Sequence, residues 1–239
     1  MDYTKRDGFE KRYQRRCAEN APGWSNDAGY QETLKSLEQA LLLEFFPKSG
    51  RTLELGCGAG NLSLFLAARG FEVQGIDLSP TAIAWANRKA QESNLRADFR
   101  VGNAVTLEGY SDEFFDLVLD GGCLQSVIGD DRRILMTNVR RVLRPGGLFR
   151  VNTICGNKEI MEPSVQGDGW CYDPQSRCQL KDRVPYYYVG LPGNILDEIC
   201  EAGFEVLKSE VREGADRTGK PFIRGQLVVD ARRPVSLRI

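Results

Sequence analysis

The sequence contains no histidine, the side chain that most often serves as a general base or a zinc ligand near neutral pH. Its seven cysteines form no Cys-x-x-Cys pair, so we expect reduced thiols rather than a zinc site or a disulfide framework. No apolar run reaches the roughly 18 residues that a membrane-spanning helix needs. Lysine plus arginine (32) balances aspartate plus glutamate (33), which leaves no electrostatic footprint for nucleic acid or an anionic membrane.

These absences favour a soluble, cytoplasmic protein. Residues 1–16 carry several basic side chains, but acidic residues interrupt them and no apolar core follows. We therefore expect neither a signal peptide nor a transit peptide. We expect no nucleic-acid partner, no membrane partner and no metal, and a monomer or a homodimer.

Hydrophobic periodicity divides the chain into alternating strands and helices. We predict strands at 52–55, 71–77, 98–104, 114–120, 148–154, 204–211 and 221–231, and helices at 31–46, 61–70, 79–94, 131–143 and 194–203. This order is typical of a Rossmann-like α/β fold: a doubly wound, mostly parallel, seven-stranded sheet with an antiparallel edge strand and helices on both faces. The last two strands are joined by a turn at 213–220 without a helix, which indicates an antiparallel pair at the edge.

The 239 residues fit a single domain, 1–239, with two additions. Residues 1–46 are expected to form a helical lid segment. Residues 155–193 are rich in Gly, Pro, Cys, Tyr and charge, and show no clean period. An irregular segment of that length is usually functional or a small inserted subdomain. Because it follows a strand at the carboxyl end of the sheet, we expect this insert to form much of a substrate pocket.

The strongest motif is ELGCGAG, from Glu54 to Gly60, between a predicted strand and a predicted helix. Its glycines allow a tight turn and a close approach to a ligand, and the helix presents its N-terminal N–H groups there. Asp77 ends the next strand about 20 residues later, the spacing that suits an acid holding ribose hydroxyls. The combination predicts a nucleoside-containing cofactor.

The residues around the glycines distinguish between cofactors. Asn61 stands where a dinucleotide fingerprint has its third small residue, and no Lys-Ser/Thr pair follows as in a phosphate-binding loop. Glu54 would repel a pyrophosphate but suits a positively charged amino group. The motif therefore favours S-adenosylmethionine over NAD.

Over residues 30–155 and 194–231 the chain resembles the class I S-adenosylmethionine-dependent methyltransferases. ELGCGAG, GIDLSPTAIAWA, GNA, FDLVLD and LRPGGLF match that family's motifs in order and spacing. The resemblance implies contacts to the methionine part, the ribose and the adenine of the cofactor, and contacts near its amino acid end. The implied cofactor-binding residues are Glu54, Gly56, Cys57, Gly58 and Gly60 (methionine), Asp77 (ribose), Leu78, Asn103 and Ala104 (adenine), and Asp120 and Gly121 (amino acid end). Asn103 departs from the usual aspartate, although an amide oxygen still accepts a hydrogen bond.

Methyl transfer needs alignment and the exclusion of water more than acid–base chemistry, because the sulfonium is already a good leaving group. Without histidine, acceptors that are nucleophilic alone, such as amines, thiols, selenols or activated carbon, are favoured. Tyr186, Tyr187 and Tyr188 could face the sulfonium through cation–π attraction or could simply pack in an extra strand. Gln125 is a candidate for orienting the acceptor. Two aromatic residues of the N-terminal segment could lie over the cofactor, Tyr13 and Trp24.

We therefore predict a methyltransferase that acts on a small-molecule acceptor by direct displacement, mainly through proximity and orientation. One alternative is intramolecular cyclisation of the cofactor with release of methylthioadenosine, and another is a cofactor-binding protein without turnover. A further alternative is methylation of a thiophilic metalloid held by four cysteines, Cys123, Cys155, Cys171 and Cys178.

Overall fold

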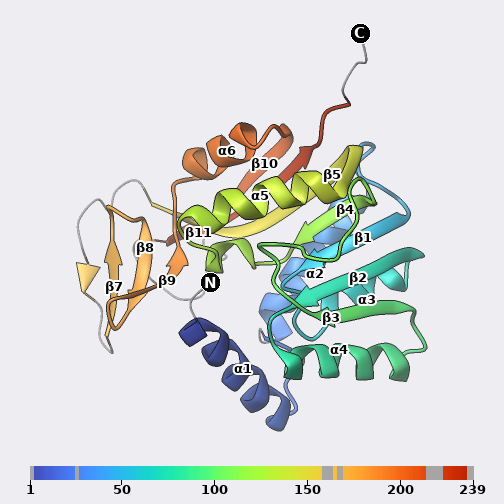
Figure 1. Ribbon diagram of the computed structural model, residues 1–239, viewed down its shortest axis with the longest axis horizontal. Helices are drawn as coiled ribbons and strands as arrows, with labels where there is room; N and C mark the ends of the chain where they lie inside the picture. The colour runs from blue at the N-terminus through green and yellow to red at the C-terminus, as the bar shows by residue number, and fades with distance from the viewer. Residues whose placement is uncertain (1–2, 25–26, 158–163, 166–168, 214–222, 236–239) are drawn as a thin grey trace.

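The main body of the protein is a seven-stranded sheet (Figure 1). The computed structural model describes residues 3–24, 27–157, 164–165, 169–213 and 223–235. The strand order is β10-β11-β5-β4-β1-β2-β3. The strands are β1 (Gly50–Leu55), β2 (Phe71–Asp77), β3 (Ala97–Val101), β4 (Phe115–Asp120), β5 (Leu143–Gly156), β10 (Glu205–Glu213) and β11 (Ile223–Arg232). β11 runs antiparallel to both β10 and β5, whereas the other pairings are parallel. This confirms the predicted fold class and the antiparallel pair at the edge.

Helices cover both faces of this sheet because its central strands are apolar on both sides. On β4, Leu117 and Leu119 pack into one core with α2 and α3, whereas Val118 points into the larger core with α5 and α6. The helices are α1 (Tyr3–Ala18), α2 (Asp27–Leu41), α3 (Asn61–Ala67), α4 (Pro80–Glu92), α5 (Asp130–Val142) and α6 (Pro192–Glu201). None of the described helices combines the length and the apolar character needed to cross a membrane.

Some of the predicted ends of helices and strands agree with the structure and others differ by several residues. Ser79 caps α4 as expected, since its side chain accepts a hydrogen bond from the N–H of Ala82 at 3.0 Å. The helix predicted at 31–46 instead ends at Leu41, where the Lys48 ammonium donates to the Leu41 and Leu43 carbonyls. The fifth strand starts at residue 143 rather than 148, because the chain there already pairs with β4. The turn predicted at 213–220 lies outside the described residues beyond 213.

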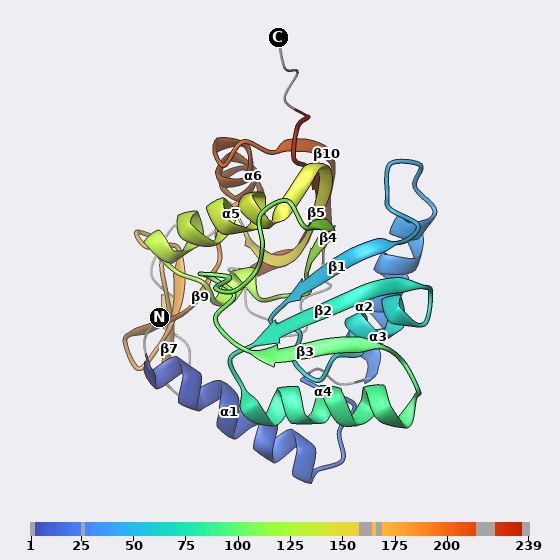
Figure 2. The same ribbon diagram turned by 45° about the vertical axis from the view of Figure 1, so that its right-hand side comes forward.

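The insert predicted at 155–193 contributes a second, antiparallel sheet. Its strands are β6 (Ser164–Val165), β7 (Trp170–Asp173), β8 (Cys178–Lys181) and β9 (Val184–Tyr188). Both ribbon views place this small sheet and α1 on the side toward which β2 and β3 point (Figures 1 and 2). The lid segment and the insert therefore both lie at the carboxyl end of the main sheet, where open α/β folds bind ligands.

Candidate functional site

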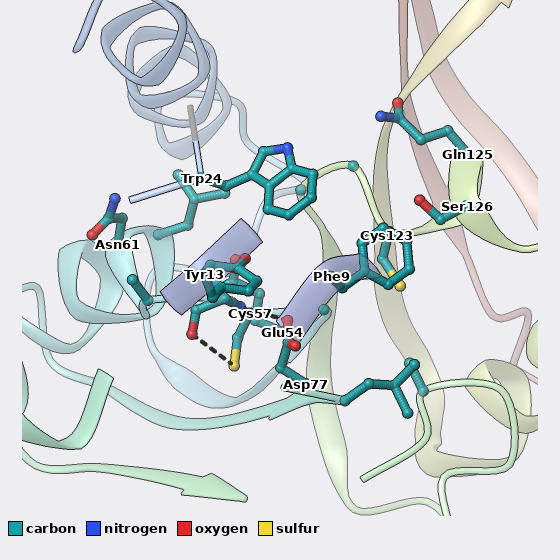
Figure 3. A pocket seen from close by; sticks show the side chains of 18 of the residues that line it. Phe9, Tyr13, Trp24, Glu54, Cys57, Asn61, Asp77, Cys123, Gln125 and Ser126 are labelled. Carbon is teal, nitrogen blue, oxygen red and sulfur yellow. Dashed lines mark hydrogen bonds between the residues drawn. The ribbon is translucent and has the colours of Figure 1, made fainter. Parts of the chain in front are cut away.

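One pocket follows the carboxyl ends of β3, β2, β1 and β4 (Figure 3). We call its wall on the main sheet the floor; it comprises the lining residues that fall within 54–62, 77–78, 102–104 and 121–127. The roof comprises Phe9, Tyr13, Trp24, Thr33 and Tyr187. The lining residues are Phe9, Tyr13, Trp24, Thr33, Glu54, Gly56, Cys57, Gly58, Ala59, Asn61, Leu62, Asp77, Leu78, Gly102, Ala104, Gly121, Gly122, Cys123, Gln125, Ser126, Val127 and Tyr187.

The glycine-rich turn folds as its sequence predicts. Gly56 and Gly58 adopt φ values of 58° and 53°, in the left-handed region that favours glycine. A side chain at Gly56 would place its Cβ 2.8 Å from that of Cys123, and one at Gly58 would collide with the hydroxyl of Tyr13. The Cys57 N–H donates to the Ile76 carbonyl at 3.0 Å, which ties the turn to β2. The turn thus needs glycine at both positions, because its backbone is left-handed there and packs closely against Cys123 and Tyr13.

Glu54 places a buried carboxyl beside this turn. Its Oε2 accepts hydrogen bonds from the N–H of Ser63 at 2.9 Å and from the Ser63 hydroxyl at 2.5 Å. Burial raises the pKa of Glu54 to about 8, an effect that these hydrogen bonds oppose and that the nearby Asp77 and Asp120 reinforce. The described lining residues include no lysine or arginine. A cationic ligand is therefore the partner that would ionise Glu54.

Asp77 ends β2 and joins two loops. Its Oδ2 accepts from the Gly58 N–H and its Oδ1 from the Ser79 N–H, both at 2.9 Å. Burial raises the pKa of Asp77, against these two hydrogen bonds. Leu78 and Ala104 line the pocket next to it. Of the four residues predicted around the ribose and the adenine, Asp77, Leu78 and Ala104 line the pocket and Asn103 does not.

Asn103 has a local role in this structure. Its Oδ1 accepts the Val105 N–H at 2.9 Å, which closes the turn after β3. An Asx turn of this kind uses the side-chain oxygen for its own backbone. Gly102, immediately before it, lines the pocket instead.

Two other residues predicted to bind the cofactor, Asp120 and Gly60, lie beneath the surface of the pocket. Oδ1 of Asp120 accepts from the N–H groups of Cys123 at 2.6 Å and Leu124 at 3.0 Å, and burial raises its pKa to about 7. The loop after β4 therefore curls around Asp120, while Gly121 lines the pocket. Gly60 precedes the first residue of α3 in a left-handed conformation (φ 73°) and faces Phe99.

The roof begins with α1 and the segment after it. The Tyr13 and Trp24 rings lie 5.3 Å apart, and the Phe9 and Trp24 rings 5.7 Å apart. The guanidinium of Arg12 stacks on Trp24 at 3.8 Å. The sequence predicted Tyr13 and Trp24 in a lid, and the structure places both over the glycine turn.

Glu10 fastens α1 to the start of α4. Its Oε2 accepts from the Ser79 hydroxyl at 2.5 Å and the Thr81 N–H at 3.3 Å, and its Oε1 accepts from the Thr81 hydroxyl. Burial alone would raise the pKa of Glu10, but these hydrogen bonds outweigh it and the pKa is lowered. A carboxylate at a helix N-terminus also interacts favourably with the helix dipole.

Of the three consecutive tyrosines, Tyr187 lines the pocket, whereas Tyr186 and Tyr188 do not. Tyr186 contacts Phe9 and Trp170, with ring centroids 6.1 and 5.3 Å away, and thus links the insert to α1. Tyr188 packs in the main core beneath the guanidinium of Arg132, 3.9 Å from its ring. Burial raises the pKa of Tyr187, so its hydroxyl stays protonated.

Several lining residues were not predicted, notably Phe9, Thr33, Asn61, Ser126 and Val127. Asn61 follows the glycine motif directly, so its position was visible in the sequence. The others come from segments whose placement depends on tertiary packing. In particular, Phe9 reaches the pocket because α1 packs on α4 through Glu10.

The cysteines of the pocket are protonated thiols in this environment. Burial raises the pKa of Cys57 and Cys123 well above that of a free thiol. No group of three possible metal ligands was found among the described residues. The floor therefore offers buried carboxyls rather than thiolates.

Known proteins resemble this chain in sequence and in fold. Residues 53–151 match the family described as a methyltransferase domain. A ubiquinone biosynthesis O-methyltransferase of Cereibacter sphaeroides is 35% identical over 120 residues, 50% of this chain and 47% of that protein, so the match spans about half the relative's length. A 2-heptyl-1-hydroxyquinolin-4(1H)-one methyltransferase of Mycobacteroides abscessus is 29% identical over 192 residues, 79% of each chain.

A solved structure agrees with these matches. The 1,6-didemethyltoxoflavin-N1-methyltransferase of Burkholderia thailandensis, determined with S-adenosylhomocysteine, superposes with a TM-score of 0.66 over 96% of this chain and 87% of that one. At 21% identity this likeness shows the fold alone. The region that matches the methyltransferase domain, residues 53–151, contains the glycine turn and the carboxyls of Glu54 and Asp77 that the sequence predicts for a class I S-adenosylmethionine-dependent methyltransferase.

Proposed function

We propose that the protein transfers a methyl group from S-adenosylmethionine to a small, flat organic acceptor. The observation that carries this proposal is the pairing of Glu54 with the glycine turn and Asp77 along one edge of the sheet. Glu54 would hold the cationic amino group of the cofactor, and Asp77 the ribose hydroxyls. The adenine would lie toward Leu78 and Ala104.

The reaction itself is a single displacement. A lone pair of the acceptor atom forms a bond to the methyl carbon while the carbon–sulfur bond breaks, and its electron pair stays on sulfur to give S-adenosylhomocysteine. The protein contributes alignment of the three atoms and a pocket that excludes water. The aromatic side chains of Phe9, Trp24 and Tyr187 would form the dry wall against which the acceptor lies.

The acceptor would have to be reactive without a protein base. The chain has no histidine, and the carboxyls that line the described pocket, Glu54 and Asp77, would be occupied by the cofactor. Tyr187 is a poor base because its pKa is raised and its hydroxyl stays protonated. An amine, a thiol or a hydroxyl acidic enough to ionise in water meets this requirement, with its proton lost to solvent. The relatives include an O-methyltransferase and a hydroxyquinolinone methyltransferase, which supports an acidic hydroxyl.

Incubation with S-adenosylmethionine carrying a deuterated methyl group tests this function. A panel of phenols, N-hydroxy heteroaromatics, aromatic amines and thiols is added, and the products are identified by mass spectrometry. We expect S-adenosylhomocysteine and one class of acceptor heavier by the labelled methyl group. Methylthioadenosine in place of S-adenosylhomocysteine would indicate cyclisation, and tight cofactor binding without consumption would indicate a binding protein.

A further inference from the structure

Gln125 lies in a short 3-10 helix after β4 (Leu124–Ser126), on the side of the pocket opposite Asn61 (Figure 3). Its side-chain Oε1 accepts a hydrogen bond from the N–H of Ile154 on β5 at 3.2 Å. A backbone N–H only donates, so the amide oxygen must face β5. The NH2 group, which carries two donors, is thereby turned the other way, and Figure 3 shows its nitrogen on the side of Trp24.

This NH2 group has no acceptor among the described residues. Its neighbours in the lining are Gly122, Ser126 and Val127, of which Ser126 carries a hydroxyl. The carboxyls of Glu54 and Asp77 already accept hydrogen bonds from the glycine turn and α3. A ligand that covers the Gln125 amide without accepting from it would leave a buried donor unpaired, at a cost of about 1–3 kcal/mol.

We propose that Gln125 is a specificity-determining residue that selects acceptors with a hydrogen-bond-accepting oxygen, a carbonyl or an oxyanion, on the ring system that is methylated. The inference rests on the proposed function and adds the acceptor's chemical class. The aromatic roof selects a flat ring, and the Gln125 NH2 group selects the oxygen on it. Gln125 thereby positions the acceptor and takes no proton.

The Gln125→Glu substitution removes both donors of the NH2 group and puts a negative charge in their place, which also disfavours an acceptor oxygen there. An ionised glutamate keeps an oxygen for the Ile154 N–H, so the loop stays tied to β5, but both donors are lost. Gln125→Leu removes both interactions and serves as the second variant. Gln91→Leu is the matched control, because Gln91 is an exposed glutamine on α4.

The probes are 1-hydroxyquinolin-2(1H)-one, which has a ring carbonyl, and 1-naphthol, which has none. Binding of each to the S-adenosylhomocysteine complex is measured at pH 8 by calorimetry, and methylation of each by mass spectrometry. For Gln125→Glu we expect the carbonyl probe to bind at least about tenfold more weakly, corresponding to one lost hydrogen bond, and 1-naphthol to change by less than about twofold. For each probe, the value for the variant is divided by the value for the wild type, so the different intrinsic reactivities of the two probes cancel.

Equal effects on the two probes, or no binding of the carbonyl probe to the wild-type complex, would overturn the assignment. Failure of the proposed function has a different signature, namely no S-adenosylhomocysteine binding to the wild type or methylthioadenosine as the product. The affinity for S-adenosylhomocysteine is expected to stay within about threefold of wild type in Gln125→Glu, which separates a specific effect from misfolding.

Discussion

The floor and the roof of the pocket are built from different kinds of contact. The floor is continuous with the sheet, and backbone hydrogen bonds and the buried side chains of Glu54 and Asp77 fix its shape. The roof comes from the N-terminal segment, with α1, Trp24 and α2, and from β9, and α1 meets β9 through the Phe9–Tyr186 ring contact. An aromatic pair contributes only about 0.5–1.5 kcal/mol beyond its buried area. The floor is thus preformed by the sheet, whereas the two parts of the roof are joined to each other by aromatic contacts.

This difference assigns separate tasks to the two walls. The floor carries the groups that suit the cofactor, and the roof carries the surface that suits the acceptor. In the proposed function, the roof would also be the route by which the cofactor and the acceptor enter and leave, since lids are usually drawn from the less stable parts of a fold. Variants of the floor should therefore change cofactor affinity, and variants of the roof should change acceptor kinetics.

The largest effect is expected on the floor, for Glu54→Gln. Removing one partner of a buried charge pair costs 2–5 kcal/mol or more, so the affinity for S-adenosylhomocysteine should fall by about 100-fold. Calorimetric titration measures it. The control is Glu72→Gln, whose carboxylate is exposed beside Arg51. An unchanged affinity in Glu54→Gln would show that the cofactor's amino group is bound elsewhere.

A smaller effect is expected in the roof, at Tyr187. Tyr187→Ala removes an aromatic wall and should raise the KM for the acceptor by about tenfold, with the affinity for S-adenosylhomocysteine within about threefold of wild type. Tyr187→Phe should behave like the wild type from pH 6 to 9, because the protonated hydroxyl takes no part in proton transfer. A loss of kcat in Tyr187→Phe would instead make the hydroxyl a participant in the reaction.

The smallest effect is expected for the contact between α1 and α4. Glu10→Gln weakens the hydrogen bonds to Ser79 and Thr81, each of which is worth about 1.5–3 kcal/mol when the acceptor is charged. We expect S-adenosylhomocysteine to dissociate about threefold faster, as measured by stopped-flow tryptophan fluorescence. Glu19→Gln, at the exposed end of the same segment, is the control. A wild-type dissociation rate would indicate that α1 does not gate release.

The floor was predictable from sequence because its signals are local. The glycines at 56 and 58, the strand ahead of them and the acid at 77 lie within one β-α-β unit, so their spacing fixes their geometry. Asn103 shows the limit of this reasoning. Its position in the chain matched a cofactor contact, but an Asx turn competes for the same side chain.

The roof was predicted only in outline. Tyr13 and Trp24 were assigned to a lid on composition, but Phe9 depends on where α1 docks, and no local pattern reports that. Alternation along an extended strand separated Tyr187 from its neighbours, yet the sequence could not say which side faces the pocket. The small sheet that decides it, β6 to β9, has strands of two to five residues, too short to show a period.

The most direct test of the cofactor site is the count of protons released when S-adenosylhomocysteine binds. Glu54, with a pKa of about 8, is mostly protonated in the free protein at pH 7. Binding of a cationic amino group favours the ionised form, so the bound pKa falls and a proton is released. The affinity should then rise with pH between 6 and 8 and level off above the free pKa.

Calorimetry at pH 7 in two buffers of different ionisation enthalpy gives the number of protons released on binding. The account predicts release of about one proton by the wild type and none by Glu54→Gln. Tight binding to the wild type without proton release would contradict the claim that Glu54 holds the cofactor's amino group.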